Sequence, residues 1–428
     1  MRGQLNLFQK TMLRWRELHP YNAVHVVRIA APLDAGWLRA TLESTLQTLG
    51  LTGYELDAEG GCYDYRGGPA TAVLDLLDAQ DDARAAACRQ IERHLNLAFP
   101  RSGPLDPFRF FAIDDGASFL LGLAYDHVVA GGDSIVVLMR SLHDRYLDRA
   151  APPPRALDLY PPNYLLLFRR YTGAILRGLP GLVTMLASCR QTARPHYRDG
   201  VPPTNEYASY VIDGEALQRA LKVARAWGVT LNDLLLALLL QTMAPLAEER
   251  KTRRRHLMAA ASIVNIRSTY QPPATQTFGQ FLSSFRVTHP MPPGISLPDL
   301  ARDIHRETER TKRRKLWLQT LLGIIGSDYA WHYMSPARRA TFHAKNYPVW
   351  GGVTLVNVDA LWREAGSGEP SEYIRGVPTG PMSPLVVAGS TTQGTLQLGI
   401  SWRSAALTRE VVDNLVAQFL ARFNSLSP

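Results

Sequence analysis

The stretch AYDHVVAGGDS, residues 124–134, decides how this chain is interpreted. It follows the apolar run FLLGL and precedes the apolar run IVVLM. A strand-like run, a short polar turn and a helix-like run in this order are typical of α/β proteins. His127 lies in that turn, so it is either a packed core residue or a base held where substrates reach it.

The composition is that of a folded globular protein, with 46% hydrophobic and 20% charged residues. A chain of 428 residues is long enough for two lobes with substantial interiors. The three cysteines, Cys62, Cys88 and Cys189, lack metal-ligand spacing, so we expect neither disulfides nor a metal site. The N-terminal segment has no continuous apolar core of a signal peptide, and we therefore expect a cytoplasmic protein.

Two apolar stretches, residues 164–186 and 316–334, are the most membrane-like parts of the sequence. Arg177 and Pro180 interrupt the first and Asp328 the second, whereas a bilayer crossing needs an uncharged span of about 20 residues. We expect no transmembrane segment, and predict buried or lid-like helices that line a long-chain pocket or simply fill the core. Association with a lipid surface is the minority alternative.

Strands and helices alternate along both halves, and each half opens with a strand followed by a helix. This pattern predicts an N-terminal lobe over 1–150, a proline-rich connector with apolar helices over 151–200, and a C-terminal lobe over 201–428. Thr230 and Asp233 have the spacing of a helix N-terminal capping box. The expected strands are 21–30, 70–78, 108–114, 117–127, 207–212, 256–267, 281–289, 352–360, 384–392 and 394–402, and the main helices are 36–50, 81–99, 134–147, 214–228, 230–249 and 408–423.

The segment DHVVAGG between a strand and a helix resembles the HHxxxDG motif of one acyltransferase superfamily. That superfamily contains chloramphenicol acetyltransferase, the condensation domains of nonribosomal peptide synthetases, wax ester synthase-type enzymes and plant alcohol acyltransferases. Further similar segments follow in the family order: YNAVHVVRIAAPLDAGWL, GVTLNDLLLALL, SIVNIRS with TFGQF, and VTLVNV with LVVAGSTTQGTLQLGISW. The resemblance implies an α/β protein of two similar lobes, each a mixed β-sheet flanked by helices, with a tunnel at their interface.

The resemblance also implies a role for His127 as general base. It would take a proton from an acceptor hydroxyl or amine while that atom attacks an acyl thioester, and a neutral imidazole suits this task. The acyl donor would be acyl-coenzyme A or a phosphopantetheine-linked chain on a carrier protein, with no permanently bound cofactor. Gly131 and Gly132 would allow close approach of a substrate to the backbone.

The motif departs from the family pattern at two positions. Asp126 replaces the first histidine, a supporting position that points to the opposite strand face. Gly131 replaces the family aspartate, which normally pairs with an arginine that Arg267 matches in sequence. We expect another acid to compensate, first Asp133 and second Asp126, because an uncompensated buried charge costs about 3–5 kcal/mol. The competing interpretation of Asp133 is a plain helix N-cap.

Further polar residues are candidates for substrate contact. Asn357 follows Val356 where wax ester synthase-type relatives have a Ser-Asn pair, so it is either an oxyanion or substrate contact or a structural tie between the lobes. The net charge of +9 is concentrated in two basic clusters. Each is either a solvated face or a contact for phosphate or an acidic carrier, through Arg253, Arg254, Lys312 and Arg313. Nucleic-acid binding is not expected, because aromatic interleaving and known motifs are missing.

The leading hypothesis is a free-standing acyltransferase that forms an ester or an amide. Its donors would come from separate molecules, and a monomer would enclose its own site. One alternative keeps His127 as base for cyclisation or dehydration of a carrier-bound acyl chain. The other is a catalytically inactive binding protein in which the altered motif is a relic.

Overall fold

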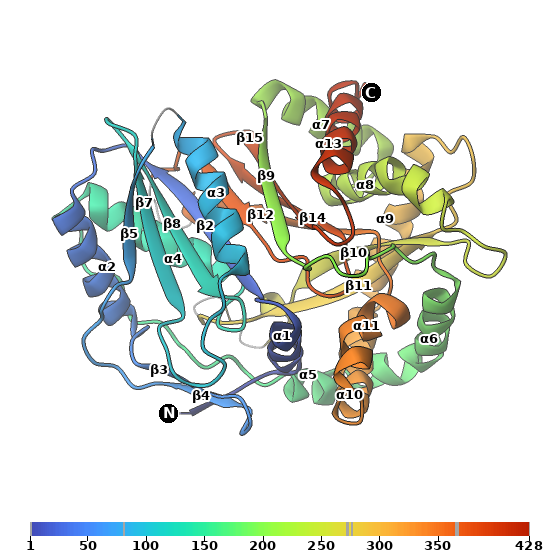
Figure 1. Cartoon of the computed structure of the whole chain (residues 1–428), viewed down its shortest axis with the longest axis horizontal. Coiled ribbons are helices and arrows are strands. Elements are labelled where there is room, and N and C mark those ends of the chain that lie inside the picture. Colours follow the sequence, from blue (N-terminus) through green and yellow to red (C-terminus); the bar gives the residue numbers. More distant parts are fainter. Residues whose placement is uncertain (1, 80–81, 271–273, 275–276, 364–367, 428) are drawn as a thin grey trace.

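The computed structural model describes residues 2–79, 82–270, 274, 277–363 and 368–427. Two mixed β-sheets lie side by side, each covered by helices (Figure 1). This arrangement confirms the predicted α/β fold of two lobes, each with a mixed sheet and flanking helices. Cys62, Cys88 and Cys189 are free in the described structure.

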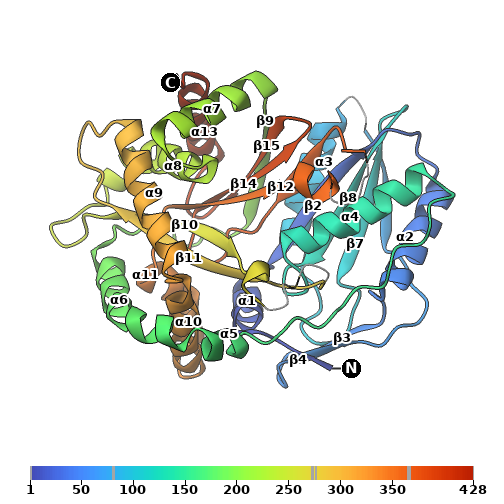
Figure 2. The same ribbon diagram turned by 180° about the vertical axis from the view of Figure 1, so that it is seen from behind.

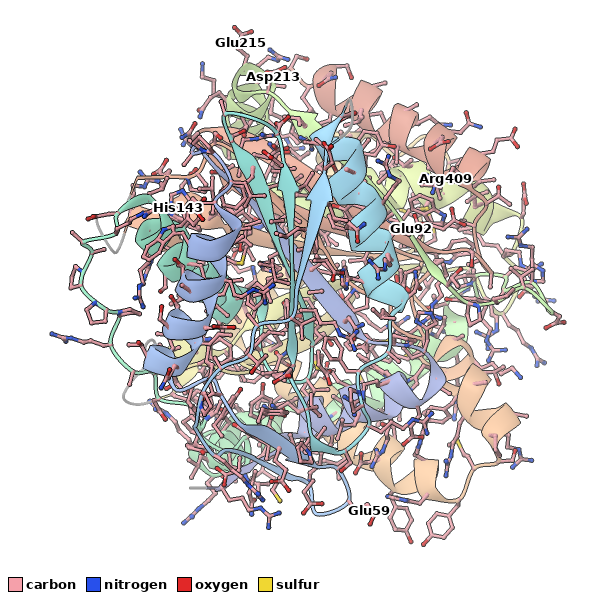
Figure 3. All side chains as sticks on the ribbon, turned by 60° about the vertical axis from the view of Figure 1, so that its left-hand side comes forward. Glu59, Glu92, His143, Asp213, Glu215 and Arg409 are labelled. Carbon is pink, nitrogen blue, oxygen red and sulfur yellow. The ribbon has the colours of Figure 1, made fainter. Side chains whose placement is uncertain are left out.

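The first sheet has the strand order β13-β2-β8-β7-β5, and only the β5–β7 pair is parallel. Helix α4 packs on one face together with α2, and α3 packs on the other (Figure 3). The bounds are β2 Asn22–Ile29, β5 Leu74–Asp78, β7 Phe108–Asp114, β8 Phe119–Asp126, β13 Tyr373–Gly376, α2 Ala35–Leu49, α3 Ala83–Asn96 and α4 Gly132–Leu147. Residue 81, where the helix predicted over 81–99 starts, lies outside the described residues.

The second sheet has the strand order β11-β10-β12-β14-β15-β9, with parallel pairs only at β10–β12 and β12–β14. Four helices, α7, α8, α9 and α13, pack around one face of this sheet. The bounds are β9 Asn205–Ile212, β10 Met258–Asn265, β11 Leu282–His289, β12 Gly351–Asn357, β14 Leu385–Thr392, β15 Thr395–Arg403, α7 Gly214–Trp227, α8 Leu231–Glu248, α9 Leu297–Arg313 and α13 Arg409–Asn424.

The remaining elements lie below the two sheets in the view of Figure 1 or bridge them. A small antiparallel sheet has the order β1-β4-β3-β6, and α1 lies centrally between the lobes. The bounds are β1 Arg2–Gln4, β3 Tyr54–Asp57, β4 Cys62–Tyr65, β6 Gly103–Pro104, α1 Leu7–Leu18, α5 Leu165–Arg170, α6 Thr172–Gln191, α10 Trp317–His332, α11 Pro336–Asn346, α12 Val358–Arg363 and a 3₁₀ turn at Arg267–Thr269.

Strand β8 is buried at every position because helices cover both faces of its sheet. Its Gly122 lies under the ring of Phe111, where a Cβ atom would come within 2.0 Å of that ring. A glycine is therefore required for the close packing of β7 against β8. This buried strand delivers Asp126 and His127 to the centre of the molecule.

The two lobes are joined by strand exchange and by contacts across their interface. Strand β13 belongs to the C-terminal half of the chain but pairs with β2 of the first sheet. Arg409 of α13 and Glu92 of α3 form an ion pair of 3.4 Å between the lobes (Figure 3). Strand β13 thus crosses from the C-terminal half into the first lobe. The predicted boundaries of the lobes and the connector, at residues 150 and 200, stay predictions.

The structure tests the capping box predicted at Thr230 and the burial predicted for the two apolar stretches. The capping box is confirmed, since the Thr230 side chain accepts from the Asp233 N–H and the Asp233 carboxylate accepts from the Thr230 N–H at 3.1 Å. The apolar stretches 164–186 and 316–334 do form helices. Of the two predicted alternatives, buried or lid-like, burial is wrong for α6, and the lid-like arrangement stays a prediction. Only Gly178 and Cys189 of α6 are buried, because no other element covers its outer face.

Candidate active site

The loop between β8 and α4 holds His127 at the interface of the two lobes. The His127 N–H donates to the Tyr21 carbonyl at 3.2 Å, and the imidazole stacks on the Tyr21 ring with centroids 5.7 Å apart. Tyr125 contacts the same imidazole edge-to-face at 5.6 Å. These rings fix the orientation of a side chain that is only 8% exposed.

The two ring nitrogens of His127 have different surroundings. Nδ1 lies 3.1 Å from the Ala130 carbonyl and 3.3 Å from the Gln280 amide nitrogen, which itself donates to the carbonyls of His127 and Ala130. A carbonyl only accepts, so we assign the proton to Nδ1, and this tautomer leaves Nε2 without a proton in the neutral ring. No hydrogen bond within the described part of the chain involves Nε2, and His127 lines a cavity of about 500 Å³. Burial, helped by the positive charge of Arg375, lowers the pKa of His127 to about 4. The imidazole is therefore neutral near pH 7, as a general base must be.

The cavity lies between the two sheets and takes its lining from both lobes. Tyr21, His127, Gly132 and Asp133 come from the N-terminal half, and Arg375 comes from the strand β13 that crosses over. The C-terminal half adds Asn265, Lys312 and Val356 among others. The interface location agrees with the predicted site, while a tunnel open at both ends stays a prediction.

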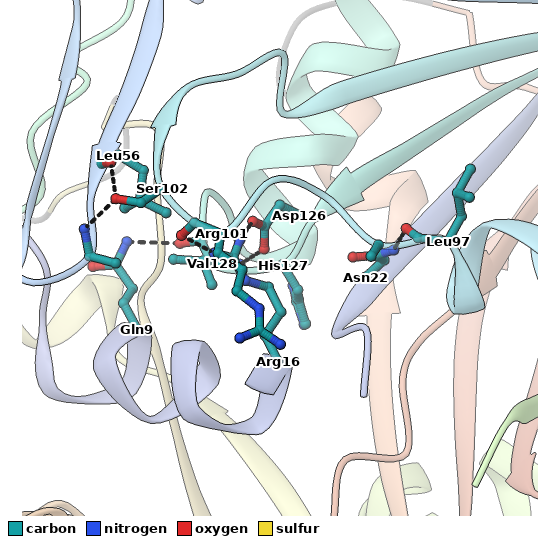
Figure 4. Close-up of polar contacts among 12 residues, drawn as sticks. Gln9, Arg16, Asn22, Leu56, Leu97, Arg101, Ser102, Asp126, His127 and Val128 are labelled. Atoms are coloured by element: carbon teal, nitrogen blue, oxygen red, sulfur yellow. Dashed lines mark hydrogen bonds and ion pairs between the residues drawn. The ribbon is translucent and has the colours of Figure 1, made fainter. Parts of the chain in front are cut away.

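Asp126 braces the strand end of the loop through a buried charge pair. Its side chain is 1% exposed and forms an ion pair with Arg16 of α1, and its other oxygen accepts from the Val128 N–H at 3.2 Å. Arg16 also donates to the Arg101 carbonyl at 2.6 Å, and Gln9 donates to the Val128 carbonyl at 2.8 Å (Figure 4). Burial raises the pKa of Asp126, and Arg16 opposes that shift.

Gln280 occupies the space next to the position of the missing motif aspartate. A Cβ atom on Gly131 would lie 3.3 Å from the Gln280 Oε1. The Gln280 amide donates to the carbonyls of His127 and Ala130, the latter at 2.7 Å. It therefore ties together the two ends of the turn that holds His127. The sequence reasoning missed this role, although TFGQF, residues 277–281, was already singled out as a similar segment.

Arg267 supports the loop, but not through the expected ion pair with Asp133 or Asp126. Its guanidinium donates to the Ser134 hydroxyl and to the Ala274 carbonyl at 2.9 Å, and lies 4.1 Å from the centroid of the Phe281 ring. Asp126 is already paired with Arg16, so that compensation is wrong. Burial lowers the pKa of Arg267 to about 10, and the charge of Asp133 opposes this shift from nearby.

Asp133 is neither the N-cap of α4 nor the partner of Arg267. The N-cap is Gly131, whose N–H donates to the Gly279 carbonyl at 3.1 Å, and Asp133 lies in the first turn of the helix. The Asp133 carboxylate accepts from the Asn265 amide and lines the cavity. The helix N-terminus also favours its negative charge.

Arg375 is a site residue that the sequence did not reveal. It is 4% exposed, donates to the Gly389 carbonyl at 3.1 Å, and its Nε has no hydrogen-bond partner in the described structure. A Cβ atom on Gly132 would lie 3.3 Å from the Arg375 Nη2, so Gly132 leaves room for this cation beside the loop. The cavity thus contains a neutral base and a buried positive charge.

Asn357 lies outside this cavity. Its side-chain oxygen accepts from the Ala360 N–H at 3.0 Å and from the Thr391 hydroxyl at 3.2 Å. It thus ties the start of α12 to the neighbouring strand β14 within the C-terminal half. The predicted tie is therefore local and does not join the lobes, while the oxyanion or substrate contact of Asn357 stays a prediction.

The four basic candidates are separated in space. Lys312, in the last turn of α9, lines the His127 cavity, whereas Arg313 lines a neighbouring basic groove. Arg253 and Arg254 are exposed in the loop between α8 and β10 and do not line the His127 cavity. Within the described ranges, no group of three or more His, Cys, Asp or Glu residues has the arrangement of a metal site.

Comparison with protein families and with curated proteins gives no match. Among solved structures, the first condensation domain of the calcium-dependent antibiotic synthetase, in complex with a substrate analogue, has a TM-score of 0.72 at 15% identity. The similarity covers 100% of this chain and 97% of that chain. This chain has the condensation-domain fold.

Two further condensation-type structures agree with this assignment. The cyclization-docking bidomain of EpoB from Sorangium cellulosum has a TM-score of 0.70 at 12% identity, covering 100% of this chain and 85% of that chain. The starter condensation domain of rhizomide synthetase, a mutant in complex with C8-CoA, has a TM-score of 0.67 at 15% identity, covering 100% and 95%. Condensation domains have the chloramphenicol acetyltransferase-like fold, which is the fold that the DHVVAGG motif predicted for this chain.

Proposed function

We propose that the chain is an acyltransferase that moves an acyl group from a coenzyme A or carrier-protein thioester to an alcohol or an amine. The observation that carries the proposal is the state of His127. Its Nδ1 is committed to the Ala130 carbonyl, and the side chain lines a cavity of about 500 Å³ between the lobes. A neutral histidine oriented in this way presents an unprotonated Nε2 to the cavity, which supports a role as general base.

In the proposed reaction, Nε2 of His127 takes the proton of the acceptor O–H or N–H as that atom attacks the thioester carbonyl. The new C–O or C–N bond forms, and the carbonyl oxygen carries the negative charge of the tetrahedral intermediate. Collapse of this intermediate breaks the C–S bond, and His127 returns the proton to the thiolate. No covalent acyl-enzyme is needed.

Arg375 is the proposed stabiliser of the negative oxygen. It lines the cavity with His127, is buried, and has an Nε without a partner. A fixed cation beside the reacting carbonyl stabilises developing negative charge by about 3 kcal/mol. This is the role that the sequence suggested for Asn357, which does not line the cavity.

The proposed donor is supported by Lys312 at the same cavity, since an ammonium group can bind a phosphate of coenzyme A or phosphopantetheine. The rhizomide synthetase starter domain was solved with C8-CoA, and its fold is similar to this one. Acyl-coenzyme A is therefore the first donor to test, and an acyl carrier protein the second.

Cyclisation or dehydration of a carrier-bound chain is the second candidate. It is favoured by the Asp133 carboxylate, which lines the cavity together with His127 and could act as a second proton-transfer group. The similar EpoB structure is a cyclization-docking bidomain. Dehydration would remove water from the bound chain, and cyclisation through attack of an internal O–H or N–H on the thioester would release the thiol without using a separate acceptor. Product mass therefore distinguishes both from acyl transfer to an added alcohol or amine.

The test is to incubate the protein with acyl-coenzyme A and acyl-carrier donors plus simple alcohols and amines, and to follow thiol release and product mass. We expect His127→Ala to lower kcat/KM by at least about 100-fold, because proton transfer is lost. His256→Ala is the matched control, since His256 is exposed and outside the cavity. Acyl transfer that His127→Ala leaves unchanged would contradict the mechanism, and lack of turnover with every donor and acceptor would contradict acyl transfer between these substrate classes.

A further inference from the structure

The surface of α5 and α6 exposes large aliphatic side chains to solvent. Val183 is 69% exposed and Leu176 is 61% exposed, and Leu165, Leu166, Leu179 and Leu186 are also exposed. Isolated surface leucines are ordinary, but a contiguous apolar face marks an interaction site. We call the exposed side of α5, α6 and α10 the lower face.

Helix α10 extends the lower face, as Figure 2 shows. Its Ile325 and Tyr329 are 41% and 71% exposed. The two helices are fixed to each other, because the Gln319 amide donates to the Gly178 carbonyl at 2.5 Å. Gly181 allows this approach, since a Cβ atom there would lie 2.5 Å from the Gln319 Nε2. The lower face is therefore a packed surface of the fold.

The charge on the lower face is mainly positive, and the acidic residue of α10, Asp328, forms an ion pair with Arg14. The sequence from residue 159 to 198 contains arginines but no aspartate or glutamate. A groove of about 800 Å³ lies between α6 and the end of α9, and five cations line it without any acidic residue: Arg170, Arg177, Arg313, Arg314 and Lys315. The geometry of this groove suits anionic headgroups beside an apolar surface.

We propose that the lower face docks on an anionic lipid membrane. An acidic protein would account for the cations, but exposed leucines, a valine and tyrosines beside cations are the pattern of helices that lie in a membrane interface. Helix α6 is long and apolar enough to cross a bilayer by length and composition. Arg177 and Pro180 within it, and its packing on α10, favour an orientation in the membrane plane.

The inner side of the same helices faces the interior. Leu182 and Met185 of α6, with Ile324 of α10, line an apolar cavity of about 370 Å³. This cavity shares Phe8 and Trp15 with the His127 cavity, so the two adjoin. A lipid chain from the membrane would thus reach the site as an acyl chain or acceptor. This last step rests on the proposed function, whereas membrane docking does not.

The experiment is cosedimentation of the full chain with vesicles of phosphatidylcholine, with and without phosphatidylglycerol. We expect binding to vesicles with phosphatidylglycerol, at least about tenfold weaker binding to phosphatidylcholine alone, and release by high salt. Equal binding to both vesicles, or none to either, would overturn the proposal.

Paired variants separate the apolar part from the charged part. Leu176→Asp with Val183→Asp should weaken binding at least about tenfold, whereas Val73→Asp, exposed in the other lobe, should not. Leu176→Ser with Val183→Ser should also weaken vesicle binding. This pair replaces the aspartate pair in the test if the aspartates impair folding. Membrane binding that survives both pairs would contradict docking through α6.

Charge variants complete the test. Arg170→Gln and Arg313→Gln should each weaken binding to anionic vesicles about fivefold. Arg219→Gln and Arg225→Gln on the exposed side of α7 are the controls. Equal losses in both sets would indicate net charge instead of a docking face and would overturn the proposal. Acyl transfer to soluble short-chain substrates, measured in parallel, distinguishes a failure of docking from a failure of the proposed function.

Discussion

The loop that holds His127 is braced in two different ways at its two ends. At the strand end, Asp126 and Arg16 form a buried charge pair. At the helix end, where the related motif has an aspartate, Gln280 and the Gly279 backbone make neutral hydrogen bonds instead. The difference shows that the shape of the loop does not require a carboxylate at its helix end. Among the described residues, no carboxylate is a cause of the His127 pKa shift, which burial dominates.

Removing one partner of the charged brace has the largest expected effect. Asp126→Asn or Arg16→Met leaves the other charge buried and unpaired, and we expect the free energy of unfolding to fall by about 3–5 kcal/mol. Urea unfolding at pH 7 measures this change. The double variant Arg16→Met with Asp126→Leu should recover most of the loss, since no buried charge remains.

The control for this prediction is an exposed pair of the same type. Arg2 and Asp57 are 3.0 Å apart with side chains 65% and 38% exposed. Arg2→Gln should therefore cost less than about 1 kcal/mol. If Asp126→Asn is as mild as Arg2→Gln, the strand end of the loop is not held by its charge pair.

Local patterns in the sequence predicted the elements around the site. The apolar run of β8, the polar turn and the apolar face of α4 are local signals, and they placed His127 correctly between a strand and a helix. The partners of the loop lie far away in sequence. Gln280 is 153 positions from His127, and Arg16 is 110 positions from Asp126. Periodicity carries no information about such pairs.

The sequence also gave no signal for which faces are covered. Residues 172–191 are apolar enough for a core helix, yet α6 is mostly exposed, because its neighbours touch only one side. Arg375 was missed because β13 leaves its own half of the chain to pair with β2. Such crossing strands are set by tertiary packing, which outweighs chain order.

The low pKa of His127 predicts how kcat/KM and the free energy of unfolding depend on pH. Burial lowers the pKa of His127 from 6.5 to about 4, so the imidazole is neutral above pH 4, and kcat/KM should halve near that pH. Between these values the unfolded chain binds the proton and the folded chain does not, so the free energy of unfolding should fall as pH falls from about 6.5 to 4.

Gly131→Asp places a carboxylate at the neutral end of the loop. We expect the half-point of the kcat/KM profile to rise by about one pH unit or more, because a nearby negative charge favours the imidazolium. Gly131→Asn, similar in size but neutral, is the matched control and should leave the half-point in place. A profile that both variants shift equally would attribute the change to shape and not to charge.

Replacing the neutral brace has the smallest expected effect on stability. Gln280→Leu keeps most of the buried volume but leaves the carbonyls of His127 and Ala130 without that donor, which should lower the free energy of unfolding by about 1–2 kcal/mol. We also expect a lower kcat with little change in KM, because the turn that orients the imidazole loosens while the cavity wall stays.

Gln319→Leu provides the control, since Gln319 is a buried amide that also donates to a backbone carbonyl but does not line the His127 cavity. It should lower stability by a similar amount without changing kcat on soluble substrates. If Gln280→Leu and Gln319→Leu affect kcat equally, Gln280 is only a structural residue. A loss of kcat confined to Gln280→Leu would instead mean that a neutral amide positions the base where the related motif has a charged aspartate.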